Sequence, residues 1–121
     1  MTFDATRHRW PSLTAMFFDQ VNARGDQPFL WAKRDGIYQP LSWGDTAARV
    51  APLARGLKAL GVDRGDRVML VSENRPAWPV SDLAIMSAGA VTVPAYTTNT
   101  ESDHLHILTD SGAKGAIVST R

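Results

Sequence analysis

The stretch IMSAGAVTVPAYTTNT, residues 85–100, carries the pattern that decides the fold. It begins as the end of an apolar helix, turns at Gly89 and continues as Val91-Thr92-Val93-Pro94, a short run typical of a strand. Pro94 ends the series of backbone donors. We interpret the small residues 87–90 as a packing feature, because they let a helix end close to a sheet without a side-chain clash.

The same alternation of helix and strand extends in both directions from this stretch. The apolar run at 67–72 predicts a strand buried on both faces, and residues 78–89 predict the helix that follows it. Downstream, Thr100 with Asp103 predicts the start of a helix over 102–111, Gly112 its end, and residues 115–120 a third strand. Strand, helix, strand, helix, strand at this spacing predicts right-handed crossovers and a parallel sheet.

The first sixty residues predict a helix, a hairpin and a second helix. Ser12 is the expected cap of a helix with apolar positions Leu13, Met16, Phe17 and Val21, which should stop at Gly25. Asp35-Gly36, between two aromatic and aliphatic runs, favours a tight antiparallel hairpin. The predicted fold class is therefore α/β, with part of a parallel sheet, flanking helices and an N-terminal β-hairpin.

The second helix should begin at the Ser42 cap, with Asp45 three residues on, and reach Gly61. Its expected buried face carries Val50, Leu53, Leu57 and Leu60. Pro52 lies in its interior, where it removes an amide donor and its ring meets the carbonyl of Ala48, at about 3 kcal/mol. We therefore expect a bend at residues 48–51.

Composition limits the class of protein more than it identifies it. The 121 residues, 44% apolar and 21% charged, suit one soluble domain. Thirteen basic and twelve acidic residues give a charge of +1 with no basic cluster, which argues against nucleic acid as a partner. With no cysteine, disulfides, thiolate catalysis and cysteine zinc sites are excluded. We found no signal peptide and no run of about twenty apolar residues, and we expect a cytoplasmic protein without a transmembrane segment.

Two polar motifs invite a metal or phosphate interpretation. His104 and His106 lie two residues apart on a predicted helix, where they point away from each other, so we interpret them as surface histidines and expect no metal site. The run TDSGAKG, 109–115, contains glycines and Lys114 but lacks the spacing of a phosphate loop. It also follows a helix C-terminus, which repels anions, and so predicts a helix stop.

Two further motifs border the predicted 67–72 strand. Arg64-Gly65-Asp66 matches an adhesion tripeptide, but a turn before a strand explains it fully. Ser72-Glu73-Asn74-Arg75 follows the strand's carboxyl end, where open parallel sheets bind ligands. The alternative is a solvated loop in which Arg75 pairs with Glu73. The residues alone predict no active site.

Three pieces of this chain, taken in order, resemble one family. They are the run from LSWGDTAARV through IMSAGAVTVPAYTTNT, the helix DHLHILTDSGAK and the strand GAIVST. Together they resemble the N-terminal portion of adenylate-forming, AMP-binding acyl-CoA synthetases. The runs NRPAW and AGAVTVP are similar to the long-chain fatty-acid CoA ligase branch. The likeness covers residues 13–121, a partial N-terminal domain after a leader at 1–12.

The resemblance implies an acid-thiol ligase with ATP, Mg²⁺ and coenzyme A. Such enzymes join a carboxylic acid, here a fatty acid, to AMP with release of pyrophosphate, and then transfer the acyl group to coenzyme A. The family's Ser/Thr/Gly-rich phosphate loop, ribose-binding aspartate, hinge and C-terminal lysine have no counterpart in these 121 residues. The resemblance therefore assigns no catalytic, cofactor-binding or metal-binding residue to this chain.

Two hypotheses follow from this resemblance. In the first, the chain is an inactive scaffold portion of a longer synthetase, with exposed strand edges and apolar surface that favour pairing into a homodimer. The parent would be cytoplasmic, and peripheral contact with a membrane is left open. In the second, the chain is a stand-alone, non-catalytic α/β module that binds a small ligand or a protein, through the loop after Ser72 or the cap at 97–100.

Overall fold

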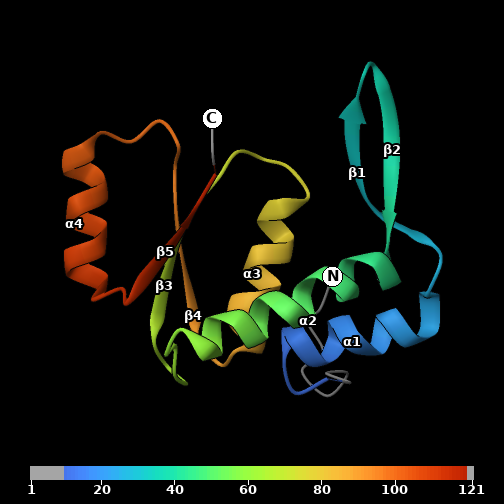
Figure 1. Cartoon of the computed structure of the whole chain (residues 1–121), viewed down its shortest axis with the longest axis horizontal. Coiled ribbons are helices and arrows are strands. Elements are labelled where there is room, and N and C mark those ends of the chain that lie inside the picture. Colours follow the sequence, from blue (N-terminus) through green and yellow to red (C-terminus); the bar gives the residue numbers. More distant parts are fainter. Residues whose placement is uncertain (1–9, 120–121) are drawn as a thin grey trace, which may run out of the picture.

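The computed structural model describes residues 10–119, in which four helices accompany the strands of two separate sheets (Figure 1). In chain order the elements are α1 (Leu13–Arg24), β1 (Pro28–Arg34), β2 (Ile37–Ser42), α2 (Trp43–Ala59), β3 (Arg67–Val71), α3 (Ala77–Ser87), β4 (Val91–Ala95), α4 (Glu101–Ser111) and β5 (Gly115–Val118). Most of the predicted leader and the end of the predicted last strand, residue 120, lie outside the described residues. The predicted α/β fold class is confirmed.

The three C-terminal strands form a parallel sheet in the order β4-β3-β5. The central strand is the most deeply buried, with Val68, Met69 and Leu70 no more than 2% exposed. Its apolar run reflects this position, since a strand between two neighbours and two layers meets no water. The prediction of a strand buried on both faces is confirmed.

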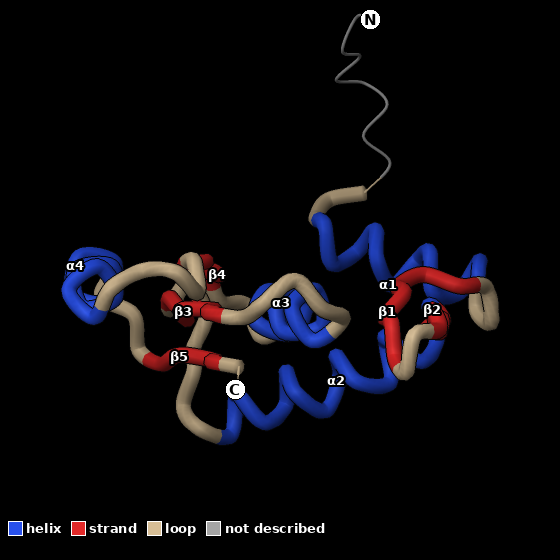
Figure 2. Tube along the Cα trace, turned by 90° about the horizontal axis from the view of Figure 1, so that it is seen from above, coloured by secondary structure: helices blue, strands red, loops and turns tan. Residues whose placement is uncertain are grey.

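The two crossover helices cover opposite faces of this sheet (Figure 2). The chain moves from β3 outward to β4, then back past β3 to β5, so two right-handed crossovers must place α3 and α4 on different sides. The core lies on the α3 side, where α3 also packs against α2 and buries Leu83, Ala84 and Ile85. By contrast, α4 contains no buried residue, and Leu105 on it is 65% exposed.

The hairpin of β1 and β2 stands apart from the parallel sheet, beside α1 and α2 (Figure 1). Asp35 and Gly36 take positive φ angles of 50° and 79°, which confirms the predicted tight turn. At its base the Phe29 ring stacks on Trp43 with centroids 3.8 Å apart, and Phe17 of α1 packs against both rings. Aromatic stacking therefore joins the hairpin to the helical layer.

Helix α2 begins as predicted but ends differently. The Ser42 and Asp45 side chains each accept a hydrogen bond from the other's backbone amide, which confirms the cap. Leu60, expected in the core, is 85% exposed because the helix ends at Ala59 and the chain turns at Gly61. Val62 takes the core position instead, and its amide donates to the Leu57 carbonyl at 3.1 Å.

Pro52 lies inside α2, which continues as a helix on both sides of it. The proline is exposed, so its ring occupies no core space. The bend expected at residues 48–51 stays a prediction.

The turn at Gly89 needs glycine for its backbone conformation. Its φ of +84° suits glycine, whereas a Cβ there would make only ordinary van der Waals contact, 3.5 Å from Cα of Arg64. Ala88 and Ala90 on either side are 1% and 7% exposed. Strand β4, however, pairs only with β3 and leaves Val91 50% exposed, so within residues 10–119 it is an edge strand.

Candidate functional site

A cavity of about 410 Å³ lies where β3 and β4 end. Ligands bind at the carboxyl ends of the strands in open α/β sheets, and this volume falls within the roughly 300–1,000 Å³ of small-molecule sites. The cavity is lined by Ser72, Glu73, Asn74, Trp78, Pro94, Ala95, Tyr96 and Thr97. The loop that begins at Ser72, which the sequence suggested as a ligand-binding position, therefore borders this cavity. Thr97, at the start of the threonine segment 97–100, borders it as well.

The loop after β3 is held by local contacts. Nε of Arg75 lies 4.0 Å from Oε2 of Glu73, so the predicted pairing is confirmed, and Oγ of Ser72 donates to the Glu73 carbonyl at 3.1 Å. A hydrogen bond from the Ser119 hydroxyl, the loop backbone and the charge of Arg75 hold the pKa of Glu73 below its ordinary value. Glu73 is therefore ionised at neutral pH and is unsuited to act as a general acid there.

Two aromatic side chains, Trp78 and Tyr96, supply the large apolar surface of the cavity. Trp78 is half-buried in the first turn of α3, whereas Tyr96 is 79% exposed just after β4. With the hydroxyl and amide groups of the rim, they suit a small molecule that has an apolar body and a few polar groups. Neither ring was predicted from the sequence, although the position of Tyr96 directly after a strand was an available signal.

The cavity has binding groups but lacks a catalytic pair. Its only ionisable side chains are Glu73 and Tyr96, and no nucleophile lies beside a base among its lining residues. In the described chain, residues 10–119, no group of three His, Cys, Asp or Glu side chains could hold a metal ion. On α4, His106 is exposed as expected of a surface histidine, whereas His104 is half-buried.

The other two motifs are structural. Gly112 caps α4 in the left-handed conformation at φ 62°, which confirms the helix stop. Lys114 Nζ lies 3.1 Å from Oδ2 of Asp66, which also accepts the Asp63 amide at 2.7 Å. The Asp63 hydrogen bond, followed by that from Lys114, holds the pKa of Asp66 below its ordinary value. Residues 63–66 thus form a turn that is held by the side chain of Lys114, which lies just before β5.

The threonine segment is divided between two roles. Thr97 lines the cavity, whereas Oγ1 of Thr100 accepts the Asp103 amide at 3.2 Å and caps α4.

No helix between residues 10 and 119 is long and apolar enough to span a bilayer.

The chain is similar to several known proteins. Residues 17–121 match the family described as AMP-binding enzyme. The chain is 36% identical over 104 residues to long-chain-fatty-acid–CoA ligase FadD15 of Mycobacterium tuberculosis, covering 84% of this chain and 17% of that protein. It is 34% identical over 82 residues to uncharacterized protein Rv1549 of the same organism, covering 68% of this chain and 47% of that protein.

Solved structures share the fold. The N-terminal subdomain of Klebsiella oxytoca NpsA superposes with a TM-score of 0.80 at 23% identity, covering 88% of this chain and 27% of that one. AB3403, a four-domain nonribosomal peptide synthetase bound to AMP and glycine, superposes with a TM-score of 0.82 at 28% identity, covering 98% of this chain and 8% of that one.

The chain spans less than a fifth of the length of FadD15. With a family match over residues 17–121, the chain belongs to the AMP-binding family of adenylate-forming enzymes.

Proposed function

We propose that the chain is part of an AMP-forming acyl-CoA ligase that activates fatty acids. In this reaction a fatty acid and ATP give an acyl-adenylate and pyrophosphate, and coenzyme A then takes the acyl group with release of AMP. The observation that carries the proposal is the 36% identity to a long-chain-fatty-acid–CoA ligase over 84% of this chain. ATP, Mg²⁺ and coenzyme A would be used by the whole enzyme.

Within that enzyme, residues 13–121 would form part of the N-terminal domain and serve as scaffold. The cavity at the strand ends lacks a nucleophile with a base, and the family's phosphate loop has no counterpart in the sequence. We therefore propose that the 121 residues alone do not catalyse the reaction. The exposed edge residues Val91 and Val118 would be covered by further chain or by a second copy. We place the enzyme in the cytoplasm.

A second candidate function is a stand-alone binding module. Two observations favour it: the cavity lined by Trp78 and Tyr96, and the similarity to Rv1549, of which the match covers nearly half. Such a module would bind a small ligand at the strand ends and would not turn it over.

The test is an assay of pyrophosphate release and acyl-CoA formation. The 121-residue chain is compared with the product of the complete reading frame, each with ATP, Mg²⁺, coenzyme A and either fatty acids of graded length or amino acids. Fatty-acid activity confined to the longer protein supports the proposal. Activity with amino acids alone, or turnover by the 121-residue chain, contradicts it. If neither protein releases pyrophosphate or forms acyl-CoA, the result favours the binding module.

A further inference from the structure

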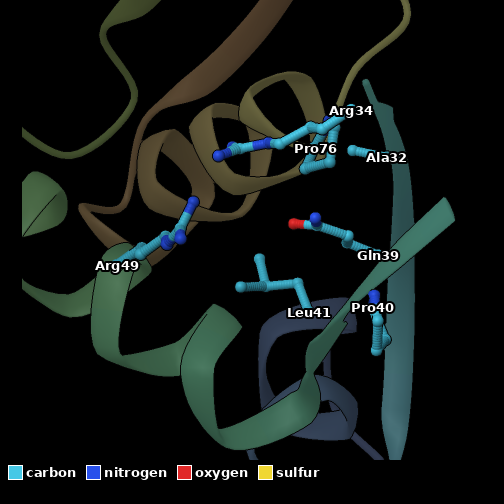
Figure 3. Close-up of a pocket in the computed structure, with 7 residues that line it drawn as sticks. All are labelled: Ala32, Arg34, Gln39, Pro40, Leu41, Arg49 and Pro76. Carbon is cyan, nitrogen blue, oxygen red and sulfur yellow. The ribbon is translucent and has the colours of Figure 1, made fainter. Parts of the chain in front are cut away.

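A second, smaller cavity lies between the hairpin and the helices (Figure 3). Its volume is about 120 Å³, which corresponds to roughly four water molecules. Three polar side chains line it, each from a different element: Arg34 of β1, Gln39 of β2 and Arg49 of α2. The other lining residues are proline or apolar, so no carboxylate balances the two arginines.

The side chains of both arginines are without partners in the described part of the chain. Among residues 10–119 neither the Arg34 nor the Arg49 side chain forms an ion pair or a hydrogen bond. In Figure 3 the two side chains and the Gln39 amide extend into the same space from three sides. Two guanidinium groups facing one cavity repel each other, and an anion between them would reverse this effect.

We propose that this cavity binds a phosphate-type oxyanion. Guanidinium groups pair with phosphate through two parallel hydrogen bonds, and the amide of Gln39 supplies a donor from another direction. Donors on three elements suit the oxygens of a tetrahedral anion better than the two coplanar oxygens of a carboxylate. The cavity, of about 120 Å³, admits the ion or the phosphate end of a larger molecule.

Binding at this site would join parts of the chain that otherwise meet mainly at the aromatic cluster of Phe17, Phe29 and Trp43. The outer hairpin is exposed, with Ile37 and Tyr38 66% and 65% accessible. An anion held by Arg34, Gln39 and Arg49 would tie this hairpin to α2. The inference is independent of the proposed ligase activity, because it concerns binding by the 121-residue chain itself.

The experiment is an amide ¹H–¹⁵N NMR titration of the 121-residue chain with inorganic phosphate, with ionic strength kept constant by sodium chloride. The expected result is a saturable shift of amides around the cavity. Binding should weaken about tenfold or more in Arg34→Gln and in Arg49→Gln, because each removes a charge-assisted contact. Arg55→Gln, an exposed arginine of α2 outside the cavity, is the matched control and should bind as the wild type does.

Glycerol 3-phosphate and acetate form the comparison arms. Saturation by both phosphate compounds supports a site for phosphate esters, and saturation by inorganic phosphate alone supports a site for the free ion. Saturation by acetate but not phosphate would assign the cavity to carboxylates, such as those of an acidic protein segment, and overturn the proposal. The absence of saturable shifts in the wild-type chain overturns it without any variant, as does unchanged binding in folded Arg34→Gln and Arg49→Gln.

Discussion

Nε of Arg67 donates a hydrogen bond of 2.7 Å to the backbone carbonyl of Ser111, which joins the first residue of β3 to the last residue of α4. The last carbonyls of a helix have no partners within it, and a cation near them is favourable. No residue of α4 is fully buried, and this contact connects the end of the helix directly to the sheet. Arg67 therefore acts as the C-terminal cap of a helix 44 positions away.

Arg67→Ala should lower the free energy of unfolding by about 1 kcal/mol, the loss expected for one largely exposed hydrogen bond from a charged group. The free energy of unfolding is measured by urea denaturation, with circular dichroism as the signal. Arg55→Ala removes an exposed arginine for which no contact is described and should change stability by less than about 0.5 kcal/mol. Equal effects of the two substitutions would show that the contact with Ser111 contributes nothing.

Gly112→Ala should also destabilise the chain, by about 1 kcal/mol, since Gly112 is left-handed at φ 62°. The new Cβ would lie 2.8 Å from a terminal nitrogen of Arg67, so that side chain must move and weaken its bond to Ser111. A double-mutant cycle tests this coupling. Gly112→Ala should cost less in the Arg67→Ala background, and strictly additive effects would refute the coupling.

Ser42→Ala should cost about 1 kcal/mol, because the Ser42 hydroxyl accepts the Asp45 amide at 2.9 Å at the start of α2. Thermal denaturation compares this variant with Ser102→Ala, which removes an exposed hydroxyl inside α4. The control should be close to neutral or slightly stabilising, since alanine favours helices. A similar loss in both variants would count against the cap.

Acid should destabilise the protein in part through Asp66. The Asp63 amide and Lys114 lower the pKa of Asp66 in the folded state, so its contribution is fully present above the unfolded pKa, near 4, and is lost as the pH falls through the folded pKa. Urea denaturation between pH 6 and pH 3 should show a smaller decrease in Asp66→Asn than in the wild type. Asp26→Asn, at an exposed position in the turn before β1, is the control and should lose as much stability on acidification as the wild type does. If Asp66→Asn also loses as much stability as the wild type over this pH range, Asp66 has no part in the acid sensitivity.

The free edge of β5 should promote self-association. Val118 is 63% exposed on a strand that pairs only with β3, and such edges accept further strands. Val118→Lys should therefore reduce the fraction of dimer measured by sedimentation velocity. Leu60→Lys, an equally polar change at the 85% exposed end of α2, should leave that fraction unchanged. A monomeric wild-type chain would remove the basis for this prediction.

Local signals allowed most elements to be predicted. Ser12, Ser42 and Thr100 are caps whose effect depends on residues three positions away, and Asp35-Gly36 is a turn with its own backbone requirement. Leu60 was misplaced because helical periodicity does not reveal the residue at which a helix ends. Because the chain turns after the helix, Val62 occupies the core position that Leu60 was expected to fill.

The candidate sites were harder to predict than the elements. Ser72 to Arg75 could be placed near a strand end, since strand ends follow from the apolar pattern. The two aromatic rings of that cavity and the three polar groups of the smaller one come from separate elements. Their proximity depends on how those elements pack, which no local pattern contains.

The sequence by itself determined the order of helices and strands, the parallel sheet and the family, because caps, turns, apolar runs and family motifs are all written in neighbouring residues. Only the tertiary structure decided that α3 and α4 lie on opposite faces, that Arg67 caps a distant helix and that Arg34 faces Arg49 across a cavity. The physical reason is that these relationships join residues far apart in the chain, and they form only when buried apolar surfaces bring whole elements together.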